Sequence, residues 1–138
     1  MRGDKVSVVF MFADGACRGN PGKGAYGVVF KDAEGRELHT LSKAIGQTTN
    51  NLAEYAGLLG GLEYAVDSKM KDLVVYLDSE LIVKQMNSIY KVRHPKLIPC
   101  YQKALKLSRQ FSSFSIEHIP RSKNTIADAL ANEALDLL

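Results

Sequence analysis

Two apolar stretches, VSVVFMFA over residues 6–13 and DLVVYL over residues 72–77, constrain the fold of this chain more than any other feature. Both are continuously apolar and rich in β-branched or aromatic residues, which is typical of strands covered on both faces of a sheet. A helical pattern lies between them, and a strand–helix–strand crossover places its two strands parallel to each other. The chain is therefore expected to form an α/β domain whose sheet is flanked by helices.

Turn and helix signals divide the segment between the two apolar stretches. The Gly/Pro-rich segment 15–24 predicts a turn that leads into a second strand over residues 25–32, and another turn leads into a third strand over residues 37–45. Because the connections are short, these three strands are expected to form an antiparallel meander. A helix is predicted after TTNN, with Asn51 as N-cap and one apolar stripe made of Leu52, Tyr55, Ala56, Leu59, Leu62 and Val66.

After residue 77 the sequence predicts two helices, a strand and a last helix. A short helix begins at about Ser79, and a basic amphipathic helix runs from Pro95 to about Phe111, since proline is favoured in a first turn. Residues 114–119 alternate as a strand does, and a helix follows over about 125–138. The predicted order is βββαβααβα in a single domain covering residues 1–138, with a five-stranded mixed sheet of three antiparallel and then two parallel strands.

Length and composition exclude several classes of protein. A chain of 138 residues with 46% apolar and 24% charged residues is ordinary for one globular domain. No apolar run approaches the roughly 20 residues of a membrane span, and the N-terminal apolar stretch is too brief for a secretory signal. Cytoplasmic residence without membrane contact is therefore expected.

Cys17 and Cys100 have neither metal-ligand spacing nor a disulfide framework, and both are expected to be reduced thiols.

Four carboxylates lie where a predicted strand ends or a predicted helix begins. Asp14 and Asp78 follow the two apolar strands directly, and Glu54 and Asp128 fall early in two helices. In an α/β sheet, ligands bind at the carboxyl ends of the strands. Negative charges gathered there are unfavourable unless a cation neutralises them, and carboxylate oxygens suit a hard cation such as Mg²⁺. If the four meet, the chain is expected to be a metal-dependent phosphotransfer enzyme.

Each carboxylate also has a purely structural interpretation. Asp14 and Gly15 could form a turn, and Asp78 could be the N-cap of the helix that follows it. Glu54 could form a capping box with Asn51, and Asp128 could form one with Thr125. For any one residue this alternative stays open. Only the combination of four such positions favours a binding site.

Basic residues are concentrated in the second half of the chain. The net charge is only +3, but residues 70–138 carry 10 Lys/Arg against 7 Asp/Glu, whereas the first 69 residues balance at 8 each. No acidic residue lies between Glu80 and Glu117. Such a stretch fits a surface that contacts a polyanion. Its cations are Lys84, Lys91, Arg93, Lys96, Lys103, Lys106 and Arg109, and Arg121 and Lys123 follow.

Four segments resemble the type 1 ribonuclease H family, and together they cover nearly the whole chain. They are DGACRGNPGKGAYGVVF (14–30), TTNNLAEYAGLLGGLEYA (48–65), VVYLDSELIVKQM (74–86) and IPRSKNTIADALANEAL (119–135). Each is moderately specific alone, whereas all four in this order and at these separations are highly specific. The resemblance implies a ribonuclease H-like fold and an endonuclease that hydrolyses the RNA strand of an RNA–DNA hybrid.

The resemblance also implies roles for individual residues. The metal-binding and catalytic set would be Asp14, Glu54, Asp78 and Asp128. In this family two Mg²⁺ or Mn²⁺ ions flank the scissile phosphate, one activating the attacking water and the other stabilising the departing 3′ oxygen. The products would carry 5′-phosphate and 3′-hydroxyl ends. The implied substrate contacts are 2′-hydroxyl and base-edge contacts from Asn20, Asn50, Asn51 and the backbone around Gly15 and Cys17, and a DNA-strand phosphate contact from Thr49.

Two regions depart from the family pattern. Many members carry a basic helical protrusion where this chain has only NSIYKVRHPK (87–96), so binding is expected to rest on Lys84, Lys91, Arg93 and Lys96. Simple turn and cap chemistry stays an alternative role for the paired asparagines of TTNN.

The second departure lies in the loop before the last aspartate. Many members have a histidine there that assists proton transfer or product release, whereas this chain has HIPRSKNTIAD (118–128). Arg121 is favoured over His118 for this role. An arginine cannot act as a base at neutral pH, so it would stabilise phosphate charge or help product release. His94 is expected to contact backbone or solvent, and His39 to be structural.

Two other functions remain compatible with such a fold. A nucleic-acid-binding module that had lost its chemistry would be expected to lack a carboxylate, and all four are present. A transposase- or resolvase-like nuclease acting on DNA would generally lack the TTNN and DGACRGNPG segments. Some members without the protrusion also cut double-stranded RNA. The expected partners are therefore an RNA–DNA hybrid and, as a second candidate, double-stranded RNA, bound by a monomer.

Overall fold

The computed structural model describes residues 7–138, so Val6 of the first predicted strand lies outside the described residues. The elements follow the predicted order βββαβααβα, with one unpredicted 3-10 turn at Arg121–Lys123 before the last helix. They are β1 (Val8–Gly19), β2 (Gly22–Lys31), β3 (Glu37–Thr48), α1 (Asn50–Asp67), β4 (Asp72–Leu77), α2 (Glu80–Met86), α3 (Ile98–Ser108), β5 (Ser113–His118) and α4 (Thr125–Asp136).

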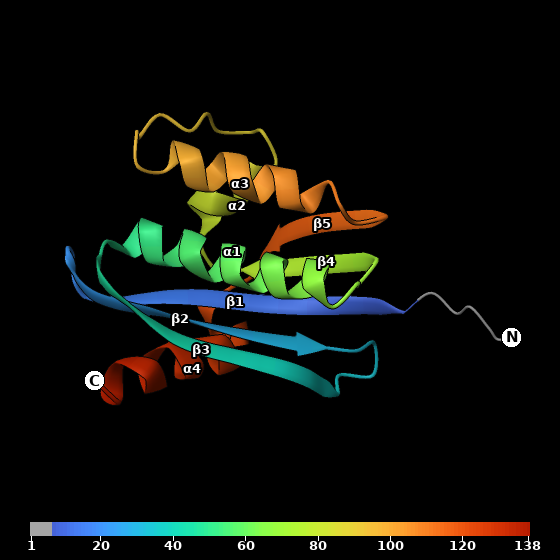
Figure 1. Cartoon of the computed structure of the whole chain (residues 1–138), viewed down its shortest axis with the longest axis horizontal. Coiled ribbons are helices and arrows are strands. Elements are labelled where there is room, and N and C mark those ends of the chain that lie inside the picture. Colours follow the sequence, from blue (N-terminus) through green and yellow to red (C-terminus); the bar gives the residue numbers. More distant parts are fainter. Residues whose placement is uncertain (1–6) are drawn as a thin grey trace, which may run out of the picture.

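The strands form one mixed sheet in the order β3-β2-β1-β4-β5 (Figure 1). The pairs β1–β2 and β2–β3 are antiparallel, whereas β1–β4 and β4–β5 are parallel. This arrangement confirms the predicted sheet of three antiparallel and then two parallel strands. It places β1 and β4, the two apolar strands, side by side at the centre of the sheet.

The turn predicted over residues 15–24 is wrong. β1 runs on to Gly19 and β2 begins at Gly22, and the two strands stay paired across this segment, so the turn is only Asn20–Pro21. The glycines were interpreted as turn residues, but a glycine inside a strand can also mark a close approach of another backbone. Gly15 is such a case, because a Cβ there would overlap the backbone of Ala53 and Glu54 in α1.

All three predicted caps that involved a carboxylate or its neighbour are wrong. The N-cap of α1 is Thr49, whose hydroxyl accepts a hydrogen bond from the Leu52 N–H at 3.4 Å, so Asn51 is not the cap. The N-cap of α2 is Ser79 and not Asp78. Helix α4 begins after Asn124, which makes no side-chain cap. The hydroxyls of Thr49 and Ser79 cap two of the helices, which leaves the carboxylates for other contacts.

Two further boundaries differ for a local reason. Helix α3 begins at Ile98 and not at Pro95, because the chain makes a turn first, in which the Leu97 N–H donates to the His94 carbonyl at 2.9 Å. Strand β3 continues to Thr48, three residues beyond its predicted end, because it stays paired with β2 as far as Gly22.

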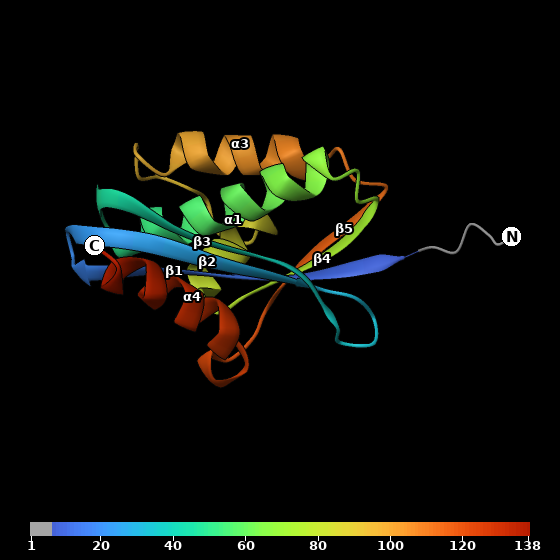
Figure 2. The same cartoon turned by 60° about the horizontal axis from the view of Figure 1, so that its bottom comes forward.

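Helices α1 and α3 cover one face of the sheet and α4 covers the other (Figure 2). The core lies between the sheet and α1, where Met11, Phe30, Tyr55 and Leu58 are fully buried. The predicted stripe of α1 is only partly right, because Ala56, Leu59 and Val66 are half-buried while Ala53, Leu58 and Ala65 are buried. Within residues 7–138, no helix is long and apolar enough to cross a membrane.

Candidate metal centre and the surrounding cavity

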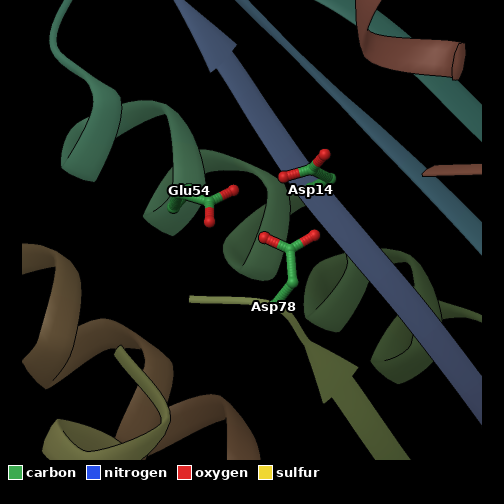
Figure 3. A group of neighbouring side chains, drawn as sticks. All are labelled: Asp14, Glu54 and Asp78. Atoms are coloured by element: carbon green, nitrogen blue, oxygen red, sulfur yellow. The ribbon is translucent and has the colours of Figure 1, made fainter. Parts of the chain in front are cut away.

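The parallel pairing of β1 and β4 brings Asp14 and Asp78 together. The ladder between the two strands ends at Ala13 and Leu77, so the next residue on each strand is an aspartate at the same edge of the sheet. Glu54 reaches this edge from α1 (Figure 3). Each of the three residues offers a carboxylate oxygen, and these oxygens all lie within 4.8 Å of one another. Carboxylates at this spacing could hold a divalent cation.

The approach of α1 to β1 depends on Gly15. With no side chain at this position, the backbone of Ala53 and Glu54 packs directly against the strand. The Gly15 N–H then donates a hydrogen bond to Oε1 of Glu54. Glu54 is therefore fixed by the strand that carries Asp14 and does not belong to a capping box with Asn51.

Burial and mutual repulsion raise the pKa of two of these carboxyls. Asp14 is only 7% exposed, and its burial, followed by the nearby Glu54, Asp78 and Asp128, raises its pKa far above the ordinary value. Burial also raises the pKa of Glu54, while the Gly15 N–H and the Arg121 guanidinium lower it in part. The ionised group is thus unfavourable in isolation, and a divalent cation would remove the repulsion.

Asp128 lines the same cavity but does not belong to the compact group of three. Its Oδ1 accepts a hydrogen bond from Asn132 one turn further along α4, at 3.2 Å. Helix α4 can pack closely against β2 because Gly27 has no side chain, whereas a Cβ there would overlap the Ala127 carbonyl. Since Gly27 pairs with Asp14 across the β1–β2 ladder, α4 passes beside the site.

The carboxylates line a cavity of about 390 Å³ together with four of the predicted substrate-binding residues, Gly15, Cys17, Asn50 and Asn51. Arg121 lines it from the 3-10 turn, whereas His118 does not. The exposed His118 lies near Glu80 instead. The full lining is Asp14, Gly15, Ala16, Cys17, Asn50, Asn51, Glu54, Asp78, Ser79, Arg121 and Asp128.

A second cavity of about 370 Å³ shares Asn51 with the first. It contains Asn20, Thr49 and Lys96, and also His94, whose Nδ1 accepts the Lys96 N–H at 3.1 Å. The predicted backbone contact of His94 is therefore confirmed. Asn20 already has a structural bond, since its Oδ1 accepts the Asn50 N–H at 3.1 Å.

The remaining predicted cations do not line either of these cavities. Lys91 lies against a separate groove next to Tyr90, and Arg93 is exposed. Lys84 forms an ion pair with Glu80 at 3.0 Å, four residues earlier on α2. The stretch without acids is therefore less basic than its sequence indicates, because acidic residues outside it supply partners.

An acidic partner outside the basic stretch also neutralises a lysine on α3, where Lys103 pairs with Glu63 of α1 at 2.7 Å.

Two other predictions concern isolated side chains. His39 stacks on Tyr64 with ring centroids 4.0 Å apart, as expected for a structural histidine. Cys17 and Cys100 are free, and the Cys17 thiol donates to the Thr48 carbonyl at 3.3 Å.

Sequence reasoning missed Asn124. This residue is 1% exposed, and its Nδ2 donates to the Ala13 carbonyl and to Oδ2 of Asp78, each at 2.9 Å. The only sequence signal is its position immediately before a predicted helix, where asparagine is a favoured N-cap residue. Ser79 was also missed as part of the cavity lining.

Comparisons with known proteins agree with this geometry. Residues 12–134 match a family model described as reverse transcriptase-like. A bifunctional protein of Mycobacterium tuberculosis is 46% identical over 129 residues, covering 93% of this chain and 35% of the relative. Ribonuclease HI of Halobacterium salinarum is 42% identical over 135 residues, covering 98% of this chain and 66% of the relative. The chain thus spans about a third of the first relative and just under two thirds of the second.

Two solved structures have the same fold. The crystal structure of RNase H1 from Halobacterium salinarum has a TM-score of 0.92 and 40% identity, covering 95% of this chain and 99% of that one. The crystal structure of LC11-RNase H1 in complex with an RNA/DNA hybrid has a TM-score of 0.88 and 42% identity, covering 94% and 97%.

Proposed function

The chain belongs to the type 1 ribonuclease H family, and from this membership we propose that it is an endonuclease hydrolysing the RNA strand of RNA–DNA hybrids. The observation that carries the proposal is the group of three carboxylates where the parallel ladder of β1 and β4 ends, with Asp14 and Asp78 from the strands and Glu54 from α1. It is supported by the similar LC11-RNase H1, which was crystallised with an RNA/DNA hybrid. All four family carboxylates line one cavity.

Two Mg²⁺ or Mn²⁺ ions are the proposed cofactors, with Asp14, Glu54 and Asp78 as ligands and Asp128 as a further ligand when substrate is bound. Close, partly buried carboxylates with raised pKa values fit hard divalent cations. When bound, such ions would neutralise the scissile phosphate and activate a water for in-line attack. The proposed products have 5′-phosphate and 3′-hydroxyl ends.

The residues around the carboxylates are proposed to select and position the hybrid. Asn50 and Asn51 are exposed polar side chains in the same cavity, where they can contact 2′-hydroxyls of the RNA strand. Thr49 and Lys96 lie in the neighbouring cavity, where a phosphate of the DNA strand would be bound. Arg121 brings a cation to the carboxylate cavity and would stabilise phosphate charge.

The direct test is cleavage of a labelled hybrid in Mg²⁺, Mn²⁺ or EDTA, with the product ends identified by mass spectrometry. Cleavage of the RNA strand in Mg²⁺ or Mn²⁺ and its absence in EDTA are expected. Parallel reactions with duplex DNA and duplex RNA define the substrate class. Tight hybrid binding without cleavage in either metal would instead identify a binding module.

Asp78→Asn should abolish cleavage, because it removes a negative charge from the compact group while keeping the shape of the side chain. The matched control is Asp72→Asn at the other end of β4, where the carboxylate accepts a hydrogen bond from Ser113 at 2.7 Å and lines no part of the cavity. Full activity in Asp78→Asn would contradict the proposal.

A further inference from the structure

Asn124 connects three of the four elements that carry the carboxylates. Its side chain bridges the Ala13 carbonyl in β1 and the Asp78 carboxylate that follows β4. Its own carbonyl accepts the backbone N–H of Asp128 at 3.2 Å, at the start of α4. A single buried residue thus contacts the residue before Asp14, the side chain of Asp78 and the backbone of Asp128.

The bond to Asp78 restricts a torsion that is otherwise soft. Rotation of an aspartate carboxylate about its last side-chain bond has broad, shallow minima. The Asn124 Nδ2 holds Oδ2 of Asp78 at 2.9 Å and so sets the plane of this carboxylate. The same carboxylate belongs to the group formed with Asp14 and Glu54, so its orientation bears on how that group can bind a cation.

Within residues 7–138, the Asn124 side chain leaves one of its own buried polar atoms unpaired. Both N–H groups of its amide are directed to acceptors, but its buried Oδ1 has no hydrogen-bond partner among the described residues. An unpaired buried acceptor destabilises the folded state. Departures from local rules of this kind are expected where a residue serves a site and not the fold.

We propose that Asn124 is a positioning residue, which orients the Asp78 carboxylate for cation binding by tying it to the Ala13 carbonyl of β1. This inference rests on the proposed function only for its effect on catalysis. Residues that orient metal ligands typically change metal affinity or activity by about 10- to 100-fold when they are replaced. The role of Asn124 is therefore measurable both with and without substrate.

The test uses Asn124→Ala, and also Asn124→Ser, which keeps a favoured N-cap residue but is too short to reach both partners. The first readout is the Mg²⁺ concentration that gives half of the maximal rise in Tm, without nucleic acid. We expect this midpoint to increase by about tenfold in both variants. An unchanged Mg²⁺ midpoint would overturn the proposal.

The second readout is hybrid cleavage at saturating substrate. We expect kcat to fall by about 10- to 100-fold with KM for the hybrid nearly unchanged, and higher Mg²⁺ to restore part of the loss. A rise in KM for the hybrid with an unchanged kcat would instead overturn the positioning role. If the wild-type protein does not cleave the hybrid, the proposed function fails, while the Tm readout still tests Asn124.

The matched control is Asn87→Ala. Asn87 also donates its Nδ2 to a strand carbonyl, that of Ile116 at 3.1 Å, but it contacts no carboxylate of the site. Its replacement should lower Tm without shifting the Mg²⁺ midpoint. Failure of both Asn124 variants to fold, checked by circular dichroism, would show that Asn124 is required for the fold and would overturn the proposal.

Discussion

The backbone N–H of Gly15 donates a hydrogen bond to Oε1 of Glu54, which joins β1 to α1 at the residue that follows Asp14. The bond is possible because Gly15 has no side chain that would overlap α1. Two carboxylates that are 40 positions apart in the sequence are thereby held on adjoining backbone segments.

Gly15→Ala should destabilise the protein and reduce cleavage, because its Cβ would force α1 and Glu54 away from β1. Overpacking of this kind lowers the free energy of unfolding by about 1–3 kcal/mol. Urea unfolding of the variant and of the wild-type protein would measure this loss. The comparison is Gly57→Ala in the same helix–strand contact, where a Cβ would lie 3.2 Å from the Asp14 carbonyl and a smaller shift is needed than at Gly15. Equal losses of activity in the two variants would contradict the special role of Gly15.

The metal-free protein should lose stability as pH rises from about 5 to 8. The pKa of Asp14 and that of Glu54 are raised on folding, so the folded state binds more protons than the unfolded state above the ordinary carboxyl pKa values. Their contribution is therefore present below those ordinary values and is lost as pH rises towards the raised ones. Asp14→Asn should flatten this slope, and unfolding measured at several pH values checks it.

Mg²⁺ should stabilise the protein most at the upper end of this pH range. At 100 times its Kd a ligand that binds only the folded state contributes about 2.7 kcal/mol. Chelation should remove this contribution, and Asp78→Asn should weaken it by removing one member of the compact group. Thermal unfolding with Mg²⁺ or EDTA measures the effect, and an equal response in Asp78→Asn would argue against the assigned ligands.

Asp128→Asn should reduce kcat less than Asp78→Asn does. The Asp128 carboxylate lies outside the compact group and is held by Asn132, so it contributes less to cation binding before substrate arrives. We expect a loss of about tenfold for Asp128→Asn against about 1000-fold or more for Asp78→Asn. Steady-state cleavage rates at saturating Mg²⁺ distinguish these outcomes, and losses of the same size would place Asp128 among the principal ligands.

Arg121→Ala should lower kcat by about 10-fold, less than the roughly 10²-fold expected for a fully desolvated donor, because Arg121 is exposed. His118→Ala should have little effect, since His118 does not line the cavity. Lys123→Ala is the matched control, because Lys123 lies in the same 3-10 turn but outside the carboxylate cavity. A larger loss in His118→Ala than in Arg121→Ala would reverse the assignment.

Lys96→Ala should reduce the salt dependence of hybrid binding by about one unit in the slope of log affinity against log salt. Lys96 lies in the cavity next to the carboxylates, where it can contact a phosphate. Lys103→Ala is the control, because Lys103 is already paired with Glu63. Equal changes in slope would indicate that binding follows the total charge of residues 84–109 and not the position of Lys96.

Much of the fold could be predicted because its signals are local. Apolar periodicity identified β4 at its observed bounds, and the short connections gave the correct pairing of the first three strands. The segment 15–24 was misread because glycine permits a turn and a close backbone approach equally well. Only the position of α1 distinguishes the two, and no local pattern contains it.

The sequence by itself determined which residues could form the site, since the four carboxylates, the asparagines of TTNN and Arg121 are recognisable by type and spacing. Only the tertiary packing brings three carboxylates into a compact group, places Asp128 beside it, and pairs Lys103 with Glu63 of another helix. The buried bond from Asn124 to Asp78 was likewise invisible. The carboxylate group and the Asn124 bond join segments far apart in the chain, and no local pattern contains those distances; close backbone approach at Gly15 and Gly27 brings α1 and α4 to the strand pair that carries Asp14.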